Sequence, residues 1–114
     1  MPDTISPDET LDVLCSEKLQ LIQRKRGYRF SIDSLFLANF VRLRKHERLL
    51  DVGTGCGIIP IYLSIMGCDN PLVGIEIQEE LFKLATRNQV LNRCDNVQFV
   101  QGDVKSFRFP HGFH

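Results

Sequence analysis

Two periods of apolar and polar residues alternate along the chain from residue 48 onward. Short apolar runs, each bounded by turn-forming residues, predict strands over 48–52, 72–76 and 96–100. Between them, apolar residues recur every three or four positions and predict helices over 58–66 and 79–92. The packing face expected on the second of these helices consists of Leu81, Leu84, Ala85, Asn88 and Leu91. Strands that alternate with helices imply right-handed crossovers and a parallel sheet, so the pattern predicts an α/β fold.

The N-terminal third shows a different pattern. Ser6-Pro7-Asp8-Glu9 matches a capping box with proline at the first helical position, which predicts a short helix to about Leu14. Segments 19–23 and 28–30 alternate in polarity around a turn at 24–27 and predict a hairpin. A further helix is expected over 33–41, with Ser31 or Asp33 as its N-cap. We therefore divide the chain into an N-terminal region, 1–45, and a sheet-forming region, 46–114.

The most informative segment follows the first expected strand and reads Leu-Leu-Asp-Val-Gly-Thr-Gly-Cys-Gly over residues 49–57. Its three glycines lack a Cβ, so the backbone can turn sharply and let a ligand lie against it. The next helix presents free N–H groups and its positive dipole end to the same place. A dinucleotide fingerprint would need another glycine where the chain has Ile58. The spacing indicates another kind of nucleotide cradle; the alternative is a turn that only packs strand against helix.

Two acids follow the later strands. Glu76 ends the strand 72–76, where an acid in an open α/β sheet accepts hydrogen bonds from ribose hydroxyls. The alternative for Glu76 is an acid that caps the helix beginning near Glu79. Asp103 follows the third strand, and its alternative is the turn-forming pair Gly102-Asp103.

The spacing Asp51-x-Gly-x-Gly-x-Gly resembles motif I of the class I S-adenosylmethionine-dependent methyltransferases. In that family the glycine loop wraps the methionine and ribose part of the cofactor. The resemblance implies S-adenosyl-L-methionine as cofactor and a partial Rossmann-like sheet with strand order 3-2-1, preceded by a helix and a hairpin. It also implies that Glu76 binds ribose, and that Asp103 accepts from the adenine amine with backbone assistance from the next residue. The cofactor-binding residues implied in this way are Phe30, Ser31, Asp33, Asp51, Gly53, Thr54, Gly55, Gly57, Glu76, Ile77, Asp103 and Val104.

The segment before motif I narrows the resemblance. Residues 27–40 read Gly-Tyr-Arg-Phe-Ser-Ile-Asp-Ser-Leu-Phe-Leu-Ala-Asn-Phe. Together with residues 19–26 they are similar to the corresponding segment of bacterial valine-tRNA adenine methyltransferases. Those enzymes methylate the exocyclic amine of an adenine in the anticodon loop. The resemblance therefore implies a tRNA partner, and it places Phe30, Ser31 and Asp33 over the methionine end of the cofactor. A related protein-glutamine methyltransferase is the alternative.

The resemblance covers about residues 9–103, and beyond them the sequence departs from the family pattern. Amine-directed methyltransferases of this type carry Asn/Asp-Pro-Pro-aromatic after the fourth strand, where the ring stacks on the flipped base. The sequence has no such motif, since Asn70-Pro71-Leu72 precedes the second strand and has one proline. We expect the cofactor-binding half of an enzyme, truncated before the fourth strand and without catalytic residues; a non-catalytic or inert fragment is the alternative. The unpaired edge of the strand 48–52 predicts self-association, unless the N-terminal hairpin covers that edge.

Composition adds little. The formal net charge is zero, so no global field draws the chain to RNA. A local basic set could contact tRNA phosphates, or form a solvated turn and helix end; it consists of Arg24, Lys25, Arg26 and Arg29, followed by Arg42, Arg44, Lys45 and Arg48. The four cysteines have no Cys-x-x-Cys spacing, which favours reduced thiols and a cytoplasmic location. We expect neither a metal site nor a membrane-spanning segment.

Overall fold

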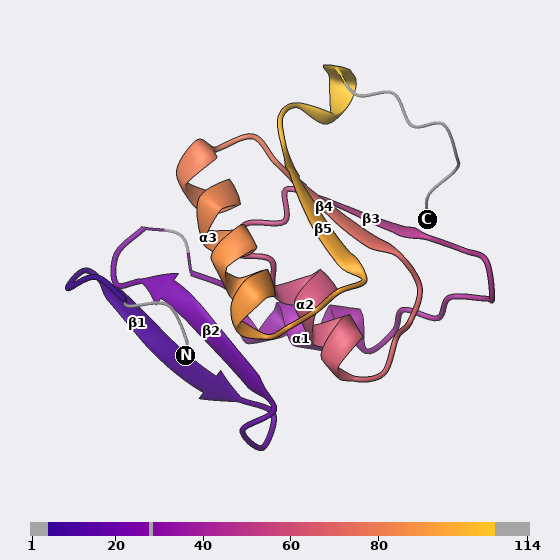
Figure 1. Ribbon diagram of the computed structural model, residues 1–114, viewed down its shortest axis with the longest axis horizontal. Helices are drawn as coiled ribbons and strands as arrows, with labels where there is room; N and C mark the ends of the chain where they lie inside the picture. The colour runs from indigo at the N-terminus through magenta and orange to yellow at the C-terminus, as the bar shows by residue number, and fades with distance from the viewer. Residues whose placement is uncertain (1–4, 28, 107–114) are drawn as a thin grey trace.

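A computed structural model describes residues 5–27 and 29–106 of the chain (Figure 1). The helix α3 lies between an N-terminal hairpin and a three-stranded sheet (Figure 1). In chain order the elements are β1 (Glu9–Leu14), β2 (Leu19–Arg24), α1 (Ile32–Ala38), β3 (Leu49–Val52), α2 (Ile58–Ile65), β4 (Leu72–Glu76), α3 (Glu79–Leu91), β5 (Val97–Gln101) and a 3-10 turn (Val104–Ser106).

The sheet is parallel and has the order β3-β4-β5. The second of the three strands therefore lies in the middle, which is consistent with the order 3-2-1 counted along these strands. Parallel neighbours require crossover connections, which α2 and α3 supply. Because both crossovers are expected to be right-handed and α2 contacts α3, the two helices lie on the same face. The predicted α/β fold with a parallel sheet is confirmed.

The hydrophobic core lies between this face of the sheet and the two crossover helices. Ile58 and Ile61 of α2 pack in one cluster with Leu72 and Val97 of the strands. Burial of one such side chain contributes about 1.5–3 kcal/mol. The expected packing face of α3 is confirmed, because Leu81, Leu84, Ala85 and Asn88 are buried and Leu91 is partly buried.

The opposite face of the sheet is apolar and more open. Strand alternation places Leu50, Val52, Val73, Ile75 and Val100 on that face. The side chain of Val52 is 57% exposed, Ile75 is buried, and the other three are partly buried. In the described part of the chain, β3 is hydrogen-bonded to β4 alone and forms an edge of the sheet.

The helix predicted from Ser6 to Leu14 is wrong, because this segment forms a turn followed by β1. One capping-box bond is nevertheless present, because the Ser6 N–H donates to Glu9 Oε1 at 3.0 Å; the Glu9 N–H donates to the Ser6 carbonyl at 3.0 Å and not to the Ser6 hydroxyl. These bonds close one turn and do not start a helix. The chain then pairs with β2 over six residues, and this tertiary pairing outweighs the local helix signal.

The hairpin joins different segments from those predicted. β1 and β2 are antiparallel, with Leu14 opposite Leu19, whereas we expected 19–23 to pair with 28–30. The Phe30 N–H donates instead to the Gln23 side-chain oxygen at 3.0 Å. Tyr28, which belongs to the predicted second strand, lies outside the described residues. β1 pairs with β2 in place of the predicted segment. Leu11 and Val13 do alternate with polar residues as in a strand, but the capping-box signal at Ser6 favoured a helix in the prediction.

The remaining helix boundaries are close to those predicted. α1 begins one residue before the expected 33–41 and ends at Ala38. Its N-cap is Ser31, whose hydroxyl accepts from the Asp33 N–H at 3.0 Å. Among residues 5–27 and 29–106, no helix is both long and apolar enough to cross a membrane.

Candidate cofactor-binding site

The carboxyl ends of the three parallel strands are joined by backbone hydrogen bonds. After β3, the N–H groups of Gly53 and Thr54 donate to the Ile75 carbonyl at 2.9 and 3.0 Å. After β5, the Gly102 N–H donates to the Glu76 carbonyl at 2.9 Å. The loops that follow β3 and β5 are therefore both held against the end of β4. The predicted site segments 51–57, 76–77 and 103–104 come together at this edge.

The glycine loop adopts a backbone conformation that favours glycine. Gly53, Gly55 and Gly57 have φ angles of +71°, +61° and +86°, in the left-handed region. Gly57 has a second reason to be glycine, because a Cβ there would lie 2.5 Å from Cζ of Phe99. A Cβ on Gly53 would meet nothing within 4 Å. Packing of strand against helix therefore accounts for Gly57, while the open space at Gly53 leaves room for a ligand.

Cys56 fills the loop as a neutral side chain. It is 1% exposed, and burial raises the pKa of its thiol to about 12. A thiol with this pKa stays protonated at neutral pH and is not a nucleophile.

Asp51 fixes the loop from the end of β3. Its Oδ2 accepts from the Thr54 hydroxyl at 2.8 Å, and Thr54 is 3% exposed. Burial raises the pKa of the Asp51 carboxyl, the Thr54 hydrogen bond lowers it, and the Glu76 charge raises it further. The net direction is upward, so the site destabilises the ionised form of Asp51.

Glu76 connects the glycine loop to the start of α3. It is 5% exposed, its Oε1 accepts from the Gly55 N–H at 2.8 Å, and its Oε2 accepts from the Gln78 N–H at 3.0 Å. A carboxylate offers about four acceptor positions, so two such bonds leave capacity for ribose hydroxyls. The bond to Gln78, the N-cap residue of α3, shows that the helix-end alternative is also part of its role. The next side chain, Ile77, is 62% exposed.

Asp103 and Val104 form the turn after β5. The Asp103 side chain is exposed, and its Oδ1 accepts from the Lys105 N–H at 3.0 Å. Its carbonyl accepts from the Ser106 N–H at 2.9 Å, and Val104 opens the 3-10 turn. The turn-forming role expected as an alternative is thus present in the structure.

Phe30, Ser31 and Asp33 lie at the beginning of α1. Phe30 is partly buried against the core, while Ser31 and Asp33 are exposed. The hydrogen bonds that the structure gives to these residues run to β2 and within α1. Among the described hydrogen bonds, none connects these three residues to the glycine loop.

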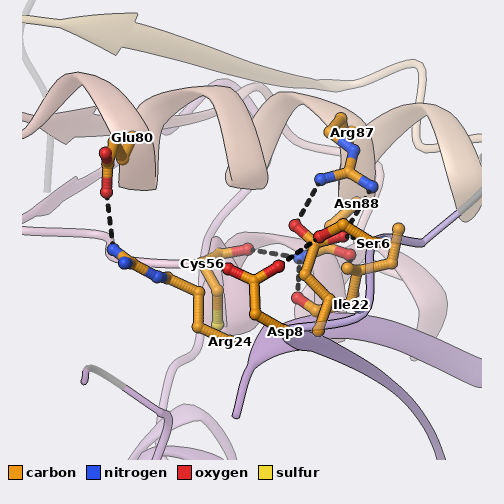
Figure 2. Close-up of polar contacts among 9 residues, drawn as sticks. Ser6, Asp8, Ile22, Arg24, Cys56, Glu80, Arg87 and Asn88 are labelled. Carbon is orange, nitrogen blue, oxygen red and sulfur yellow. Dashed lines mark hydrogen bonds and ion pairs between the residues drawn. The ribbon is translucent and has the colours of Figure 1, made fainter. Parts of the chain in front are cut away.

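The basic set is divided between paired and exposed side chains. Arg24 forms an ion pair with Glu80 at 2.6 Å, which Figure 2 shows at the first turn of α3. Arg29 pairs with Asp12 at 2.9 Å and also donates to the Arg24 carbonyl at 2.6 Å. Lys25 and Arg26 are exposed at the turn that follows β2.

Sequence reasoning missed a contact made by Asn88. We assigned this residue to the packing face of α3, but its amide also binds the Cys56 carbonyl in the glycine loop at 3.0 Å (Figure 2). A sequence signal existed, because an asparagine within an apolar helix face has to find hydrogen-bond partners when it is buried.

The chain matches a family model and several known proteins. The model of the protein-L-isoaspartate(D-aspartate) O-methyltransferases matches residues 30–107. A tRNA1(Val) (adenine(37)-N6)-methyltransferase of Tolumonas auensis is 23% identical over 83% of this chain and 41% of its own length. A release factor glutamine methyltransferase of Fusobacterium nucleatum is 36% identical over 53% of this chain and 17% of its own length. The chain thus spans less than half the length of these relatives.

Comparison with solved structures supports the fold. The structure of P. horikoshii TYW2 in complex with MeSAdo superposes with a TM-score of 0.75 and 19% sequence identity. The superposition covers 90% of this chain and 39% of that chain. At this identity the likeness concerns the fold alone.

Proposed function

We propose that this chain, which belongs to the protein-L-isoaspartate(D-aspartate) O-methyltransferase family, carries the cofactor-binding region of a methyltransferase that acts on an adenine exocyclic amine in tRNA. The cofactor is S-adenosyl-L-methionine, as the family and its structural neighbours indicate. The substrate assignment depends on one observation: the alignment with the tRNA-methylating relative covers 83% of this chain. A match of that length has to include part of the hairpin and α1. Cytoplasmic tRNA processing is the corresponding cellular role.

The residues at the strand ends fit this cofactor. Gly53 leaves the backbone of the loop open to a ligand, and Glu76 has acceptor capacity where ribose hydroxyls would lie. Asp103 and the backbone of Val104 would hold the adenine, and Ile77 would contact the cofactor beside Glu76. The cofactor supplies an activated methyl group for an in-line displacement. The chain's own residues contribute binding and orientation, on which such a displacement mainly depends.

A second candidate substrate is the glutamine amide of a protein. The observation that favours it is the higher identity, 36% over 60 residues, to the release factor methyltransferase of F. nucleatum. That match covers 53% of the chain, against 83% for the tRNA-methylating relative. We therefore place tRNA first.

Binding of the purified chain to an unmodified anticodon stem-loop, measured by fluorescence anisotropy with S-adenosylhomocysteine present, tests the substrate assignment. We expect saturable, salt-dependent binding that weakens in the double variant Lys25→Ala, Arg26→Ala, because both side chains are exposed beside β2. Loss of two phosphate contacts should reduce the slope of log K against log salt by about 2.

The double variant Lys18→Ala, Lys83→Ala removes the same charge from exposed positions outside the basic set and serves as the control. Equal losses in both double variants would indicate non-specific attraction. Binding to a release factor, with none to the stem-loop, would contradict the tRNA assignment and support the glutamine alternative.

A further inference from the structure

Two asparagines, one within α3 and one at its C-cap, cover the outer edge of β2. Asn88 Oδ1 accepts from the Ile22 N–H at 2.7 Å, and its Nδ2 donates to the Ile22 carbonyl at 3.0 Å. One helical turn later, Asn92 Oδ1 accepts from the Gln20 N–H at 3.0 Å, and its Nδ2 donates to the Gln20 carbonyl at 2.6 Å. Each amide therefore pairs with one residue of β2 as a neighbouring strand would. The hairpin is fastened to α3 through these paired bonds.

The two asparagines differ in their remaining bond. The second donated bond of Asn92 goes to the Asn88 carbonyl at 2.7 Å, within the same helix. The second donated bond of Asn88 goes to the Cys56 carbonyl at 3.0 Å, within the glycine loop (Figure 2). Asn88 is 0% exposed, so its amide has no access to water as a substitute partner.

The Cys56 carbonyl depends on this donor because of the sequence around it. Cys56 precedes Gly57, the N-cap of α2, so its carbonyl lies outside the helical hydrogen-bond series, and Pro60, four residues later, has no N–H to offer. The carbonyl of Gly57, one residue further on, does receive a helical bond from the Ile61 N–H at 3.1 Å. A buried carbonyl without a donor is destabilising, because it has lost its hydrogen bonds to water. Asn88 therefore holds the peptide that joins Cys56 to Gly57 in its orientation.

We propose that Asn88 is a positioning residue for S-adenosylmethionine binding, which couples the N-terminal hairpin to the glycine loop. This inference rests on the proposed use of that loop to hold the cofactor. One amide group bonds to both Ile22 and Cys56, so a displacement of either segment breaks a bond to the other. Coupling between binding and a distant segment is reciprocal. Cofactor binding should therefore strengthen the attachment of β2 at Ile22.

The test compares Asn88→Asp with the matched control Asn92→Asp in the full chain. Each change replaces one side-chain NH2 group, with its two N–H donors, by one acceptor oxygen. Each also places one negative charge opposite a carbonyl of β2. Only Asn88→Asp also removes the donor to Cys56. We expect calorimetric titration with S-adenosylhomocysteine to show at least tenfold weaker binding for Asn88→Asp and less than a threefold change for Asn92→Asp.

Amide hydrogen exchange followed by NMR gives a readout in the unmodified chain, which remains informative if Asn88→Asp does not fold. On addition of S-adenosylhomocysteine, exchange of the Ile22 N–H should slow, and the side-chain amide signals of Asn88 and the Gly57 N–H should shift more than those of Asn92. Unchanged signals in a chain that binds the ligand would overturn the proposal, as would equal losses of affinity in the two variants. Failure of the unmodified chain to bind would overturn the proposed function together with this inference.

Discussion

At the scale of single residues, the site is organised by the carboxylates at the ends of β3 and β4. Asp51 is bound to Thr54, and Glu76 is bound to Gly55, so each acid of the parallel strands holds part of the glycine loop. The loop is thus fixed by the protein's own groups. Preorganisation of this kind lowers the entropic cost of ordering the loop when a ligand binds.

Replacement of Glu76 by alanine tests its place in the site. Glu76→Ala removes the acceptor for the Gly55 N–H together with the proposed ribose contact. We expect cofactor binding to weaken by roughly 1.5–3 kcal/mol, the value of hydrogen bonds to a charged group. Titration calorimetry on the folded variant measures it. The control is Glu79→Ala, which removes an exposed acid paired with Lys83 at 3.0 Å; equal affinities in the two variants would exclude Glu76 from the site.

The raised pKa of Asp51 predicts that the stability of the fold depends on pH. Because its pKa in the folded chain is raised above 3.8, the folded state holds a proton that the unfolded state loses first. Stability from this group is therefore present below pH 3.8 and is lost as the pH rises through the raised pKa. Asp51→Asn keeps an acceptor for Thr54 and removes the titration.

Urea unfolding of both forms at pH 4 and about pH 7 measures this effect. The stability of Asp51→Asn relative to the unmodified chain should increase with pH, by about 1.4 kcal/mol for each tenfold change in the acid dissociation constant. A difference that does not vary with pH would contradict the assignment.

At the scale of elements, the sequence predicts the sheet-forming part well and the N-terminal part poorly. The strands and helices from β3 to β5 follow from their periodicity, with boundaries that differ from the predictions by one or two residues at most. The error at β1 arose because Ser6 and Glu9 carry a helix-start signal that a single turn satisfies as well. In the site, the strand-end acids were identified from spacing. The contact of Asn88 with the glycine loop was not, because it depends on how α3 packs against two segments distant in sequence.

The turn between β1 and β2 is strained, which gives a prediction about the hairpin. Cys15, Ser16 and Glu17 have φ angles of +54°, +54° and +69°, in the region that favours glycine and asparagine. Glu17→Gly should stabilise the chain by roughly 0.5–1 kcal/mol, because relief of strain exceeds the added entropy of the unfolded state. The midpoint of urea unfolding measures this, with Lys18→Gly as control. A lower midpoint for Glu17→Gly would contradict the strained turn.

At the scale of the whole molecule, the apolar surfaces are unevenly covered. The helices α2 and α3 cover one face of the sheet, whereas the hairpin packs on α3 and does not pair with β3 in the described sheets. The edge strand β3 and the adjoining open face, with Val52 at 57% exposure, are therefore suited to association. We propose that two copies of the chain associate through this edge.

Substitution at Val52 tests this association. A charged residue on an edge strand opposes pairing with another strand, so Val52→Lys should weaken self-association at least tenfold. Sedimentation velocity over a range of protein concentrations measures it. Val90→Lys places the same charge on α3, at a side chain that is 64% exposed, and serves as the control. A monomeric unmodified chain at all concentrations, or equal effects of the two substitutions, would contradict association through β3.

The central claim is that the strand ends of this chain form a working S-adenosylmethionine site. Calorimetric titration of the purified chain with S-adenosylmethionine, S-adenosylhomocysteine and NAD tests it most directly. We predict saturable binding of the first two with one site per chain, and no binding of NAD, because Ile58 replaces the glycine that a dinucleotide loop requires. A folded chain that binds neither S-adenosylmethionine nor S-adenosylhomocysteine would contradict the account.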